Sequence, residues 1–247
     1  MKQEKIIMGM TIVVEVIDND VTQKSLEKIF SYFRAVDRQF SPYKRDSEVS
    51  KINRGEIAKD DYSLEMKEVI KLAQETQLET EGFFNIYHNG RLDPSGIVKG
   101  WAIQKAAEML KEMGFKNFYI NAGGDIQVLG RNNKGKNWSV GIKNPFNTKQ
   151  IVKAVVLKNE SIATSGIYIR GQHIYNPHKE KHSANIVSLS VISKNIFDSD
   201  RFATAAFAMG EKGIYFLESL KGVEGYMIDK NGIATETSGF RKYVYSY

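Results

Sequence analysis

The spacing of apolar residues predicts three amphipathic helices in the first half of the chain. Apolar side chains recur at intervals of three and four residues over 22–38, 62–80 and 97–113, which places them on one face of each helix. Thr22 is a candidate cap for the first helix, and Gly114 is a candidate stop for the third. The apolar face of the second helix is expected to carry Met66, Val69, Ile70, Ala73 and Leu78.

Runs of β-branched and apolar residues predict strands, most of them in the second half of the chain. One strand is expected at 7–17, before the helices, and a closing hairpin is expected to turn at Asp229–Gly232. A helix at 211–220 leads into that hairpin. The remaining strands are expected at 115–124, 125–131, 137–143, 151–159, 161–170, 171–176 and 185–193.

Helices come first and strands later, without the regular βαβ alternation of a parallel sheet. This order predicts an α+β fold with a mixed or antiparallel sheet. The polar segments 40–56 and 81–96 are interpreted as loops. No repeat, low-complexity tract or proline-rich linker divides the sequence, and we therefore expect a single domain over residues 1–247.

Composition and charge narrow the class of protein. Hydrophobic residues make up 42% of the chain and charged residues 26%, which is ordinary for a soluble globular protein. The net charge of +6 would attract anionic ligands, but the lysines are scattered and first indicate a solvated surface. Accordingly, no nucleic-acid partner is expected.

The absence of cysteine excludes disulfides, thiolate metal sites, cysteine nucleophiles and an anchor on a lipid-modified cysteine. No stretch approaches the roughly 18 consecutive apolar residues of a membrane span. The N-terminus also lacks the apolar core and the small-residue cleavage site of a secretory signal. We therefore expect a cytoplasmic protein, or an extracytoplasmic one if a leader has been removed.

Residues 197–210, FDSDRFATAAFAMG, predict a buried helix that begins among charged residues. Asp200 and Thr204 lie four residues apart, so a helix places their oxygens on one face, and such oxygens suit Mg²⁺. Asp198 is the better candidate for a helix cap, while Arg201 has no evident role. The local sequence leaves capping and metal binding equally open.

Two further segments could bring a ligand close to the backbone. Gly123, Gly124 and Asp125 follow a strand, and glycine permits close approach, although a tight turn is the simpler interpretation. Asp93 and Lys99 flank the start of a predicted helix. The first N–H groups of a helix can donate hydrogen bonds to a bound phosphate or to a capping side chain. The glycine directly after Lys99 costs about 1 kcal/mol relative to alanine, which indicates a packing or ligand-binding reason.

Polar side chains in two other segments are candidates for binding or proton transfer. Tyr43 and Lys44 could stack on a ring and attract an anionic group, or they could belong to a solvated loop. No G-x-S-x-G motif surrounds Ser165, so a serine-hydrolase site near Ser165 and Arg170 is not indicated. His173 could act as a general acid or base, although a lone histidine is more often structural.

Six segments follow one another along nearly the whole chain in a characteristic order. They are MGMTIVVEV, FSPYKRDSEVSKIN, LDPSGIVKGWAIQKAAEML, NAGGDIQVLG, ATSGIYIR with HIYNP, and DRFATAAFAMG. In this order they resemble the motifs of the ApbE family, the FAD:protein FMN transferases. The stretch between Phe84 and Leu92 is shorter than is usual in that family. Residues that depart from the family pattern are Met10, Asn85, Ser95, Gln104 and Asn176.

The resemblance implies an ApbE-like domain that transfers FMN from FAD to a threonine or serine hydroxyl of a flavoprotein partner, with Mg²⁺ and with release of AMP. It implies Asp200, Thr204 and the backbone carbonyl of Val98 as metal ligands, and His173 as the base for the accepting hydroxyl. A homodimer is the candidate assembly. FAD contacts are expected from Met8, Tyr43, Asp93, Lys99, Gly123, Gly124, Asp125, Ser165 and Arg170.

Two other functions would use the same residues. An FAD pyrophosphatase would share the metal site and use water as the acceptor, and a flavin-binding protein would hold FAD without turnover. Because a mere binder needs no bridging cation, the presence of both Asp200 and Thr204 argues against the flavin-binding protein. The sequence does not separate the transferase from the pyrophosphatase.

Overall fold

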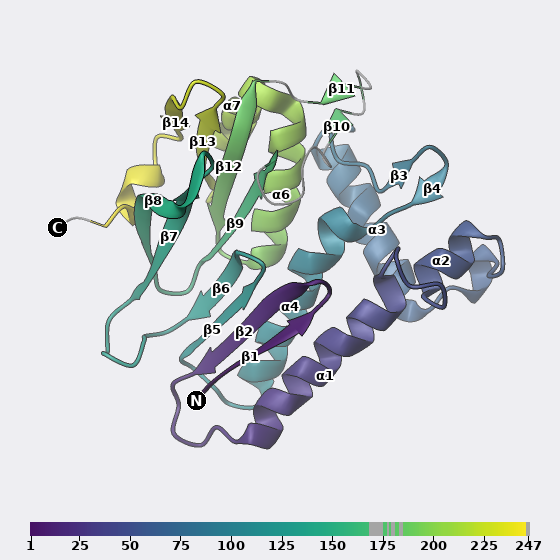
Figure 1. Cartoon of the computed structure of the whole chain (residues 1–247), viewed down its shortest axis with the longest axis horizontal. Coiled ribbons are helices and arrows are strands. Elements are labelled where there is room, and N and C mark those ends of the chain that lie inside the picture. Colours follow the sequence, from purple (N-terminus) through teal and green to yellow (C-terminus); the bar gives the residue numbers. More distant parts are fainter. Residues whose placement is uncertain (168–174, 177, 179–180, 183–184, 246–247) are drawn as a thin grey trace.

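The centre of the structure is an eight-stranded sheet in which neighbouring strands run antiparallel (Figure 1). The computed structural model describes residues 1–167, 175–176, 178, 181–182 and 185–245. The sheet confirms the predicted α+β class and selects the antiparallel alternative. In order across the sheet, the strands are β1 (Lys2–Ile7), β2 (Met10–Val16), β5 (Phe118–Ala122), β6 (Asp125–Leu129), β9 (Ser161–Gly166), β12 (Ile186–Ser193), β13 (Glu224–Asp229) and β14 (Ala234–Glu236).

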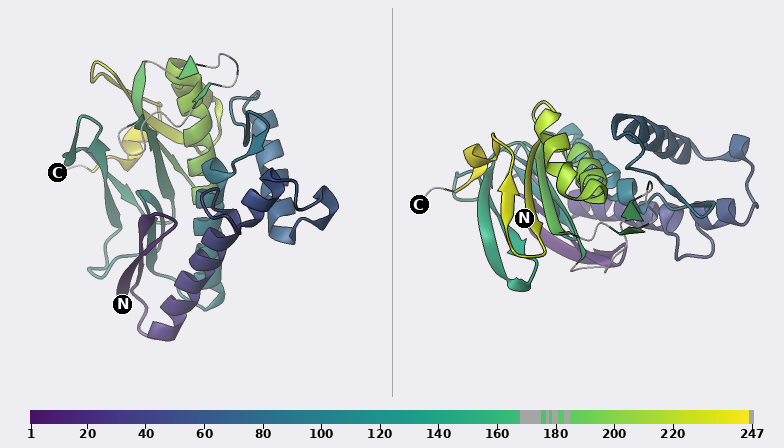
Figure 2. Two further views of the ribbon diagram at one scale, coloured as in Figure 1. Left: turned by 45° about the vertical axis from the view of Figure 1, so that its right-hand side comes forward. Right: turned by 90° about the horizontal axis from the view of Figure 1, so that it is seen from above.

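Helices cover one face of this sheet and a β-hairpin covers the other (Figure 2). The hairpin consists of β7 (Trp138–Asn144) and β8 (Asn147–Leu157). Successive residues of a strand point to opposite faces, and β12 is buried at every position, as expected for a strand covered on both sides. The helices against the sheet are α1 (Gln23–Phe40), α4 (Ser95–Glu112), α6 (Ile196–Met209) and α7 (Gly213–Ser219).

Each face of the sheet has its own apolar core. The core under the helices includes Val14, Phe33, Ile120, Val191 and Phe207. The core under the hairpin is completed by the 3-10 helix η3 (Phe240–Tyr243). It includes Val128, Trp138, Leu157, Ile192 and Phe240.

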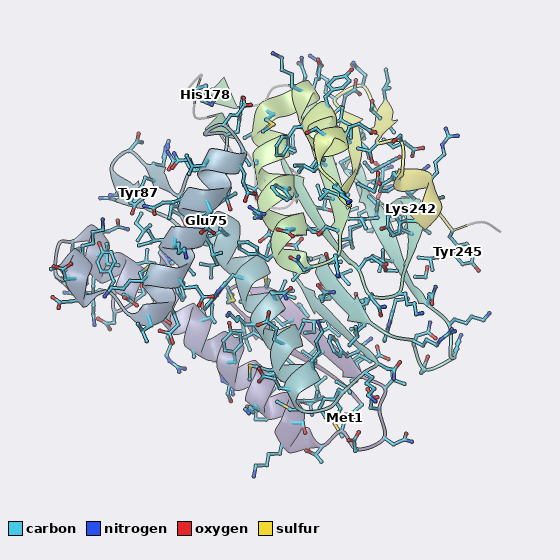
Figure 3. The ribbon with its side chains drawn as sticks, turned by 180° about the vertical axis from the view of Figure 1, so that it is seen from behind. Met1, Glu75, Tyr87, His178, Lys242 and Tyr245 are labelled. Carbon is cyan, nitrogen blue, oxygen red and sulfur yellow. The ribbon has the colours of Figure 1, made fainter. Side chains whose placement is uncertain are left out.

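The remaining elements lie outside the eight-stranded sheet (Figure 1). His178, labelled in Figure 3, lies between β10 and β11 and contacts the segment after α3: its Nε2 is 3.0 Å from the Glu81 carbonyl oxygen, and its ring is 4.5 Å from that of Phe83. The elements outside the eight-stranded sheet, its covering helices and the β7–β8 hairpin include α2 (Glu48–Asn53), η1 (Lys59–Asp61), α3 (Leu64–Glu79), β3 (Tyr87–His88), β4 (Arg91–Leu92), β10 (Tyr175–Asn176) and β11 (Lys181–His182).

The three predicted helices of the first half are confirmed, with one error in the second. Thr22 caps α1 through its side chain, and Gly114 follows α4 with a φ of 92°. Leu78 was assigned to the apolar face of α3, but it is 81% exposed. The buried face continues through Thr76 and Thr80 instead, and Leu78 projects away from it.

The predicted strand at 7–17 is confirmed as β2 from Met10 onward, and this strand is the second arm of a hairpin. The chain reverses at Met8 and Gly9, whose φ angles are 57° and 69°, and Ile7 pairs with Met10 across the turn. Two positive φ values in a two-residue connection are typical of a type I′ turn. The preceding strand β1 was not predicted, because at the sheet edge most of its residues are polar and at least partly exposed.

The predicted loops contain short ordered elements. Segment 40–56 includes α2, and segment 81–96 includes β3, β4 and the first two residues of α4. Six residues are too few for helical periodicity to show in the sequence of α2. The helix at 211–220, formed by η2 (Gly210–Lys212) and α7, and the closing hairpin are confirmed. Throughout the described ranges, no helix has both the length and the apolar character needed for a membrane crossing.

Candidate active site

Helices α4 and α6 pack closely at two glycines. The backbone N–H of Gly100 donates a hydrogen bond to Asp200 Oδ2 at 2.7 Å, and a Cβ placed on Gly100 would lie 2.7 Å from Asp200 Cβ. One turn earlier in α4, a Cβ on Gly96 would lie 3.6 Å from Thr204 Cγ2. Packing therefore explains the glycine inside α4, and it brings Asp200 and Thr204 against the same side of that helix.

Asp125 and Asp200 form a buried carboxylate pair. They are 1% and 4% exposed, and no other Asp or Glu in the described part of the chain is as deeply buried. Asp125 opens β6, where its Oδ1 accepts a hydrogen bond from the Thr164 N–H of β9 at 3.2 Å. Lys99 of α4 reaches both carboxylates, because its Nζ lies 2.5 Å from Asp125 Oδ2 and 3.5 Å from Asp200 Oδ1. Three segments that are remote in sequence thus meet at one ammonium group.

The charges of this carboxylate cluster (Lys99, Asp125 and Asp200) are not balanced. Burial raises the pKa of Asp200 to about 7, the Lys99 charge acts to lower it, and the Asp125 charge raises it further. Asp125 Oδ2 is buried and accepts no hydrogen bond from the described residues, so its contact with Lys99 is an ion pair. Two carboxylates facing one ammonium leave one excess negative charge when all are ionised. Such a cluster suits a divalent cation with oxygen ligands.

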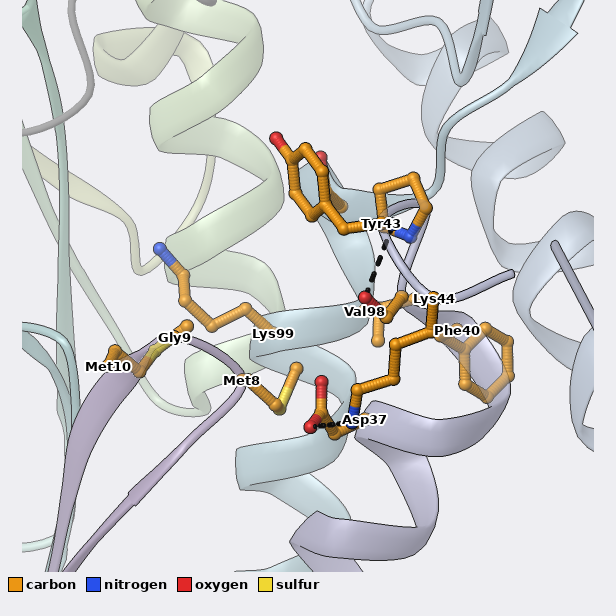
Figure 4. A pocket seen from close by; sticks show the side chains of 12 residues that line it. Met8, Gly9, Met10, Asp37, Phe40, Tyr43, Lys44, Val98 and Lys99 are labelled. Atoms are coloured by element: carbon orange, nitrogen blue, oxygen red, sulfur yellow. Dashed lines mark hydrogen bonds and ion pairs between the residues drawn. The ribbon is translucent and has the colours of Figure 1, made fainter. Parts of the chain in front are cut away.

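A cavity of about 440 Å³ opens beside the carboxylate cluster (Figure 4). Its walls are the β1–β2 turn, the end of α1 with the segment after it, and the first turns of α4. Lys99 belongs both to the wall and to the cluster, so a ligand in the cavity would lie next to the buried charges. The lining residues are Met8, Gly9, Met10, Asp37, Phe40, Ser41, Pro42, Tyr43, Lys44, Ser95, Val98 and Lys99.

Comparison with known proteins identifies the family. The sequence model of the ApbE family matches residues 8–90 and 87–227. The chain belongs to the ApbE family. Curated relatives named FAD:protein FMN transferase include one from Vibrio cholerae, 29% identical over 165 residues, and one from Rhodobacter capsulatus, 37% identical over 131 residues. The first match covers 63% of this chain and 48% of the relative, and the second covers 49% and 25%, so the chain spans half or less of these relatives' length.

Solved ApbE structures share the fold of this chain. The flavin transferase ApbE from Vibrio cholerae matches with a TM-score of 0.85 at 22% identity, over 98% of both chains. The ApbE protein from Thermotoga maritima matches with a TM-score of 0.86 at 19% identity, over 100% of this chain and 99% of that one. The resemblance and the fold expected from it are both confirmed.

Residues predicted from the ApbE motifs lie in the cavity wall, in the carboxylate cluster and at the α4–α6 contact. Gly123 and Gly124 form the β5–β6 turn with φ angles of 62° and 105°, and a Cβ on Gly123 would lie 2.9 Å from the Met10 sulfur. The positive φ angles favour glycine at both positions of this turn, and the turn packs against Met10 of the cavity wall. The predicted residues that line the cavity, join the carboxylate cluster or lie at the α4–α6 contact are Met8, Tyr43, Val98, Lys99, Asp125, Asp200 and Thr204.

Four other predicted contacts do not line the cavity or cannot be placed. Asp93 is exposed, and its Oδ1 accepts a hydrogen bond from the Ser95 N–H at 3.0 Å, so it stabilises the start of α4. Ser165 is buried in β9, on the side of that strand that faces α6. Arg170 and His173 lie outside the described residues, and their roles stay predictions.

The first residues of the motif at 40–53 form part of the cavity wall, whereas its end fastens α2 to β4. Tyr43 stands at the rim, 96% exposed, and Lys44 bonds to Asp37 at 2.5 Å. Asn53 exchanges two hydrogen bonds with the Leu92 backbone, which fastens α2 to β4. Asp37 and Phe40 were missed as lining residues, although their spacing of three at the end of α1 puts them on neighbouring positions of one face.

The start of α6 corrects the prediction for Asp198. The cap is Asn195, whose side chain accepts a hydrogen bond from the Asp198 N–H at 2.9 Å. Asp198 already lies in the first helical turn, where its carboxylate accepts a bond from Arg201 Nε at 2.8 Å. Arg201 also donates to Thr76 Oγ1 at 3.2 Å and pairs with Glu79 at 2.5 Å. Arg201 therefore ties α6 to the end of α3.

Proposed function

We propose that this protein transfers FMN from FAD to a threonine or serine hydroxyl of a flavoprotein partner, with Mg²⁺ and with release of AMP. The name FAD:protein FMN transferase of the curated relatives supports this activity. The observation that carries the proposal is the position of Lys99, which joins the cavity wall to the Asp125–Asp200 pair. Phosphates bound in the cavity would lie beside a buried site with excess negative charge, which favours a bridging cation.

The donor set fits Mg²⁺. Asp200 supplies a buried carboxylate, Thr204 a hydroxyl one turn further along α6, and Val98 would supply a backbone carbonyl. These are the oxygen ligands that this ion prefers. The buried Asp125 Oδ2, which accepts no hydrogen bond from the described residues, adds negative charge nearby. A bound Mg²⁺ would neutralise charge that develops on the pyrophosphate as it is cleaved.

The other lining residues suit the remaining parts of FAD. Tyr43 offers an aromatic face at the rim, and the ammonium group of Lys99 favours phosphates. In the reaction, the acceptor oxygen bonds to the FMN phosphorus while the bond from that phosphorus to the AMP oxygen breaks. His173 is the proposed acceptor of the hydroxyl proton. The single domain and the homodimer remain parts of the proposal.

Incubation with FAD, Mg²⁺ and a candidate acceptor domain, followed by mass spectrometry, tests this function. FMN on the acceptor, absent when the acceptor hydroxyl is replaced or Mg²⁺ is chelated, supports the transferase. Free FMN and AMP beside an unmodified acceptor would identify an FAD pyrophosphatase instead. Intact FAD that stays bound to the protein would identify a flavin-binding protein.

A further inference from the structure

The ammonium group of Lys99 contacts both buried carboxylates, beside the proposed metal ligand Asp200. Its Nζ lies 2.5 Å from Asp125 Oδ2 and 3.5 Å from Asp200 Oδ1. We propose that Lys99 is the resident counter-ion of the metal-free protein and that Mg²⁺ displaces its ammonium group from the carboxylates. This inference rests on the proposed metal site and adds to it a lysine that competes with the metal.

The charges explain why the lysine and the metal exclude each other. Two carboxylates hold one ammonium and keep one negative charge in excess, whereas one divalent cation alone neutralises them. Both cations on the same carboxylates would repel each other at short range, in a buried place where water screens charge poorly. Because Lys99 is attached to α4, its ammonium is always close by and acts as an intramolecular competitor.

After its displacement, the ammonium group of Lys99 would still contribute to ligand binding in the cavity. The Lys99 side chain is 23% exposed and lines the cavity, unlike the two carboxylates that it contacts. On leaving the carboxylates it would stay at the cavity wall, where the phosphates of FAD are proposed to bind. Mg²⁺ and FAD would then strengthen each other's binding, since each favours the same displaced position of Lys99.

Calorimetric titration of the FAD-free protein with Mg²⁺ tests the competition. Lys99→Met removes the charge at similar side-chain length, and we expect it to lower the Kd for Mg²⁺ by about tenfold or more. Lys105→Met is the matched control, because Lys105 lies on the same helix but pairs with Glu68 of α3. The control should leave the Kd unchanged. A Kd for Lys99→Met that equals or exceeds the wild-type value overturns the proposal.

A second measurement uses the wild-type protein and so does not depend on the folding of a variant. Acetylation of amines at fixed pH, followed by mass spectrometry, reports the reactivity of Lys99 with and without Mg²⁺. We expect Lys99 to react faster at saturating Mg²⁺, with Lys105 unchanged as the internal reference. Unchanged or slower Lys99 acetylation, in a protein that binds Mg²⁺, overturns the role of Lys99 alone. Absence of Mg²⁺ binding in both wild type and Lys99→Met overturns the proposed metal site as well.

Discussion

The two faces of the central sheet are built on opposite principles. On the helix face, α4 and α6 enclose the Asp125–Asp200 pair, which Lys99 reaches from the cavity wall. On the hairpin face, the apolar core under β7 and β8 consists of aliphatic and aromatic side chains, and the two buried charged residues of the described chain, Asp125 and Asp200, both belong to the carboxylate cluster. The change occurs within single strands, since Asp125 belongs to the charged cluster and its neighbour Ile126 to the hairpin-side core.

The contrast separates chemistry from stability. Burying a carboxylate costs free energy unless charge or hydrogen bonds compensate it, whereas burying apolar surface stabilises the fold. We therefore expect substitutions within the carboxylate cluster to change metal binding and turnover with little loss of stability. Substitutions on the hairpin face should lower stability and leave the properties of the folded site intact.

Asp200→Asn should have the largest effect on function. The amide can still accept the hydrogen bond from Gly100, but it lacks the charge that would hold a cation. We expect FAD turnover to fall by about 100-fold or more. The metal-free melting temperature should be no lower than that of wild type, because one buried charge is removed. Activity assays and thermal melts with and without Mg²⁺ measure both effects.

Asp198→Asn is the control for this variant, because Asp198 is two residues away and pairs with Arg201 rather than with the carboxylate cluster. It should keep the rise in melting temperature that Mg²⁺ produces in wild type, whereas Asp200→Asn should lose it. A full Mg²⁺ response in Asp200→Asn would show that the buried carboxylate pair is not the metal site.

Leu157→Ala should have the largest effect on stability. Leu157 is fully buried on the hairpin face and lies opposite Trp138 in the hairpin. The cavity left behind should lower the free energy of unfolding by about 2–5 kcal/mol in urea denaturation. Ile151→Ala, on an exposed part of the same strand, should change it by less than about 0.5 kcal/mol. A changed Kd for Mg²⁺ in folded Leu157→Ala would mean that the two faces are coupled.

Gly100→Ala should disturb both properties, because it acts at the contact that positions the chemistry. The new Cβ would lie 2.7 Å from Asp200 Cβ and 3.1 Å from the Ile196 carbonyl oxygen, so α4 and α6 must move apart. We expect a loss of about 1–3 kcal/mol in stability, together with weaker Mg²⁺ binding by calorimetry. Gly96→Ala meets its neighbours at 3.5 Å and beyond and should be tolerated. Equal effects at both positions would rule out this clash as the cause.

The sequence predicted elements correctly where the local signal was sufficient. Thr22 and the spacing after it define α1, and the turn at Asp229–Gly232 defines the closing hairpin. The predictions were wrong where contacts between distant parts of the chain determine the conformation. Leu78 is apolar but points away from the buried face of α3, and Met8 adopts a positive φ that its residue type does not favour. The cap of α6 is Asn195 and not the predicted Asp198, because the helix begins at Ile196 and Asp198 already lies in its first turn.

The site was predicted as a set of residues and not as a geometry. Helical spacing alone brings Asp200 and Thr204 onto one face. The meeting of Lys99, Asp125 and Asp200 depends instead on how α4, β6 and α6 are arranged, and no local spacing encodes that arrangement. Likewise, a glycine inside α4 indicated some close contact, but only the fold identifies Asp200 as the partner.

The carboxylate of Asp18 accepts several hydrogen bonds that stabilise its negative charge, whereas Asp125 Oδ2 accepts none from the described residues. It accepts bonds from the Lys116 N–H at 3.1 Å, the Asn117 N–H at 2.8 Å and the Asn117 side chain at 3.2 Å. Burial acts to raise the pKa of Asp18, but the hydrogen bonds from Asn117 and Lys116 outweigh it, so this pKa lies below its ordinary value.

Asp18→Asn is therefore expected to have the smallest effect, and one that depends on pH. A lowered folded-state pKa means that the ionised group stabilises the fold above its unfolded pKa, and that this contribution is lost as the pH falls through the folded pKa. Because Asp18 is only partly buried, the variant should lose less than about 1 kcal/mol at neutral pH. Urea denaturation should show this difference shrinking below about pH 4. A difference that stays constant on acidification would mean that the charge of Asp18 is not its source, and that the contrast with the buried pair lies in packing alone.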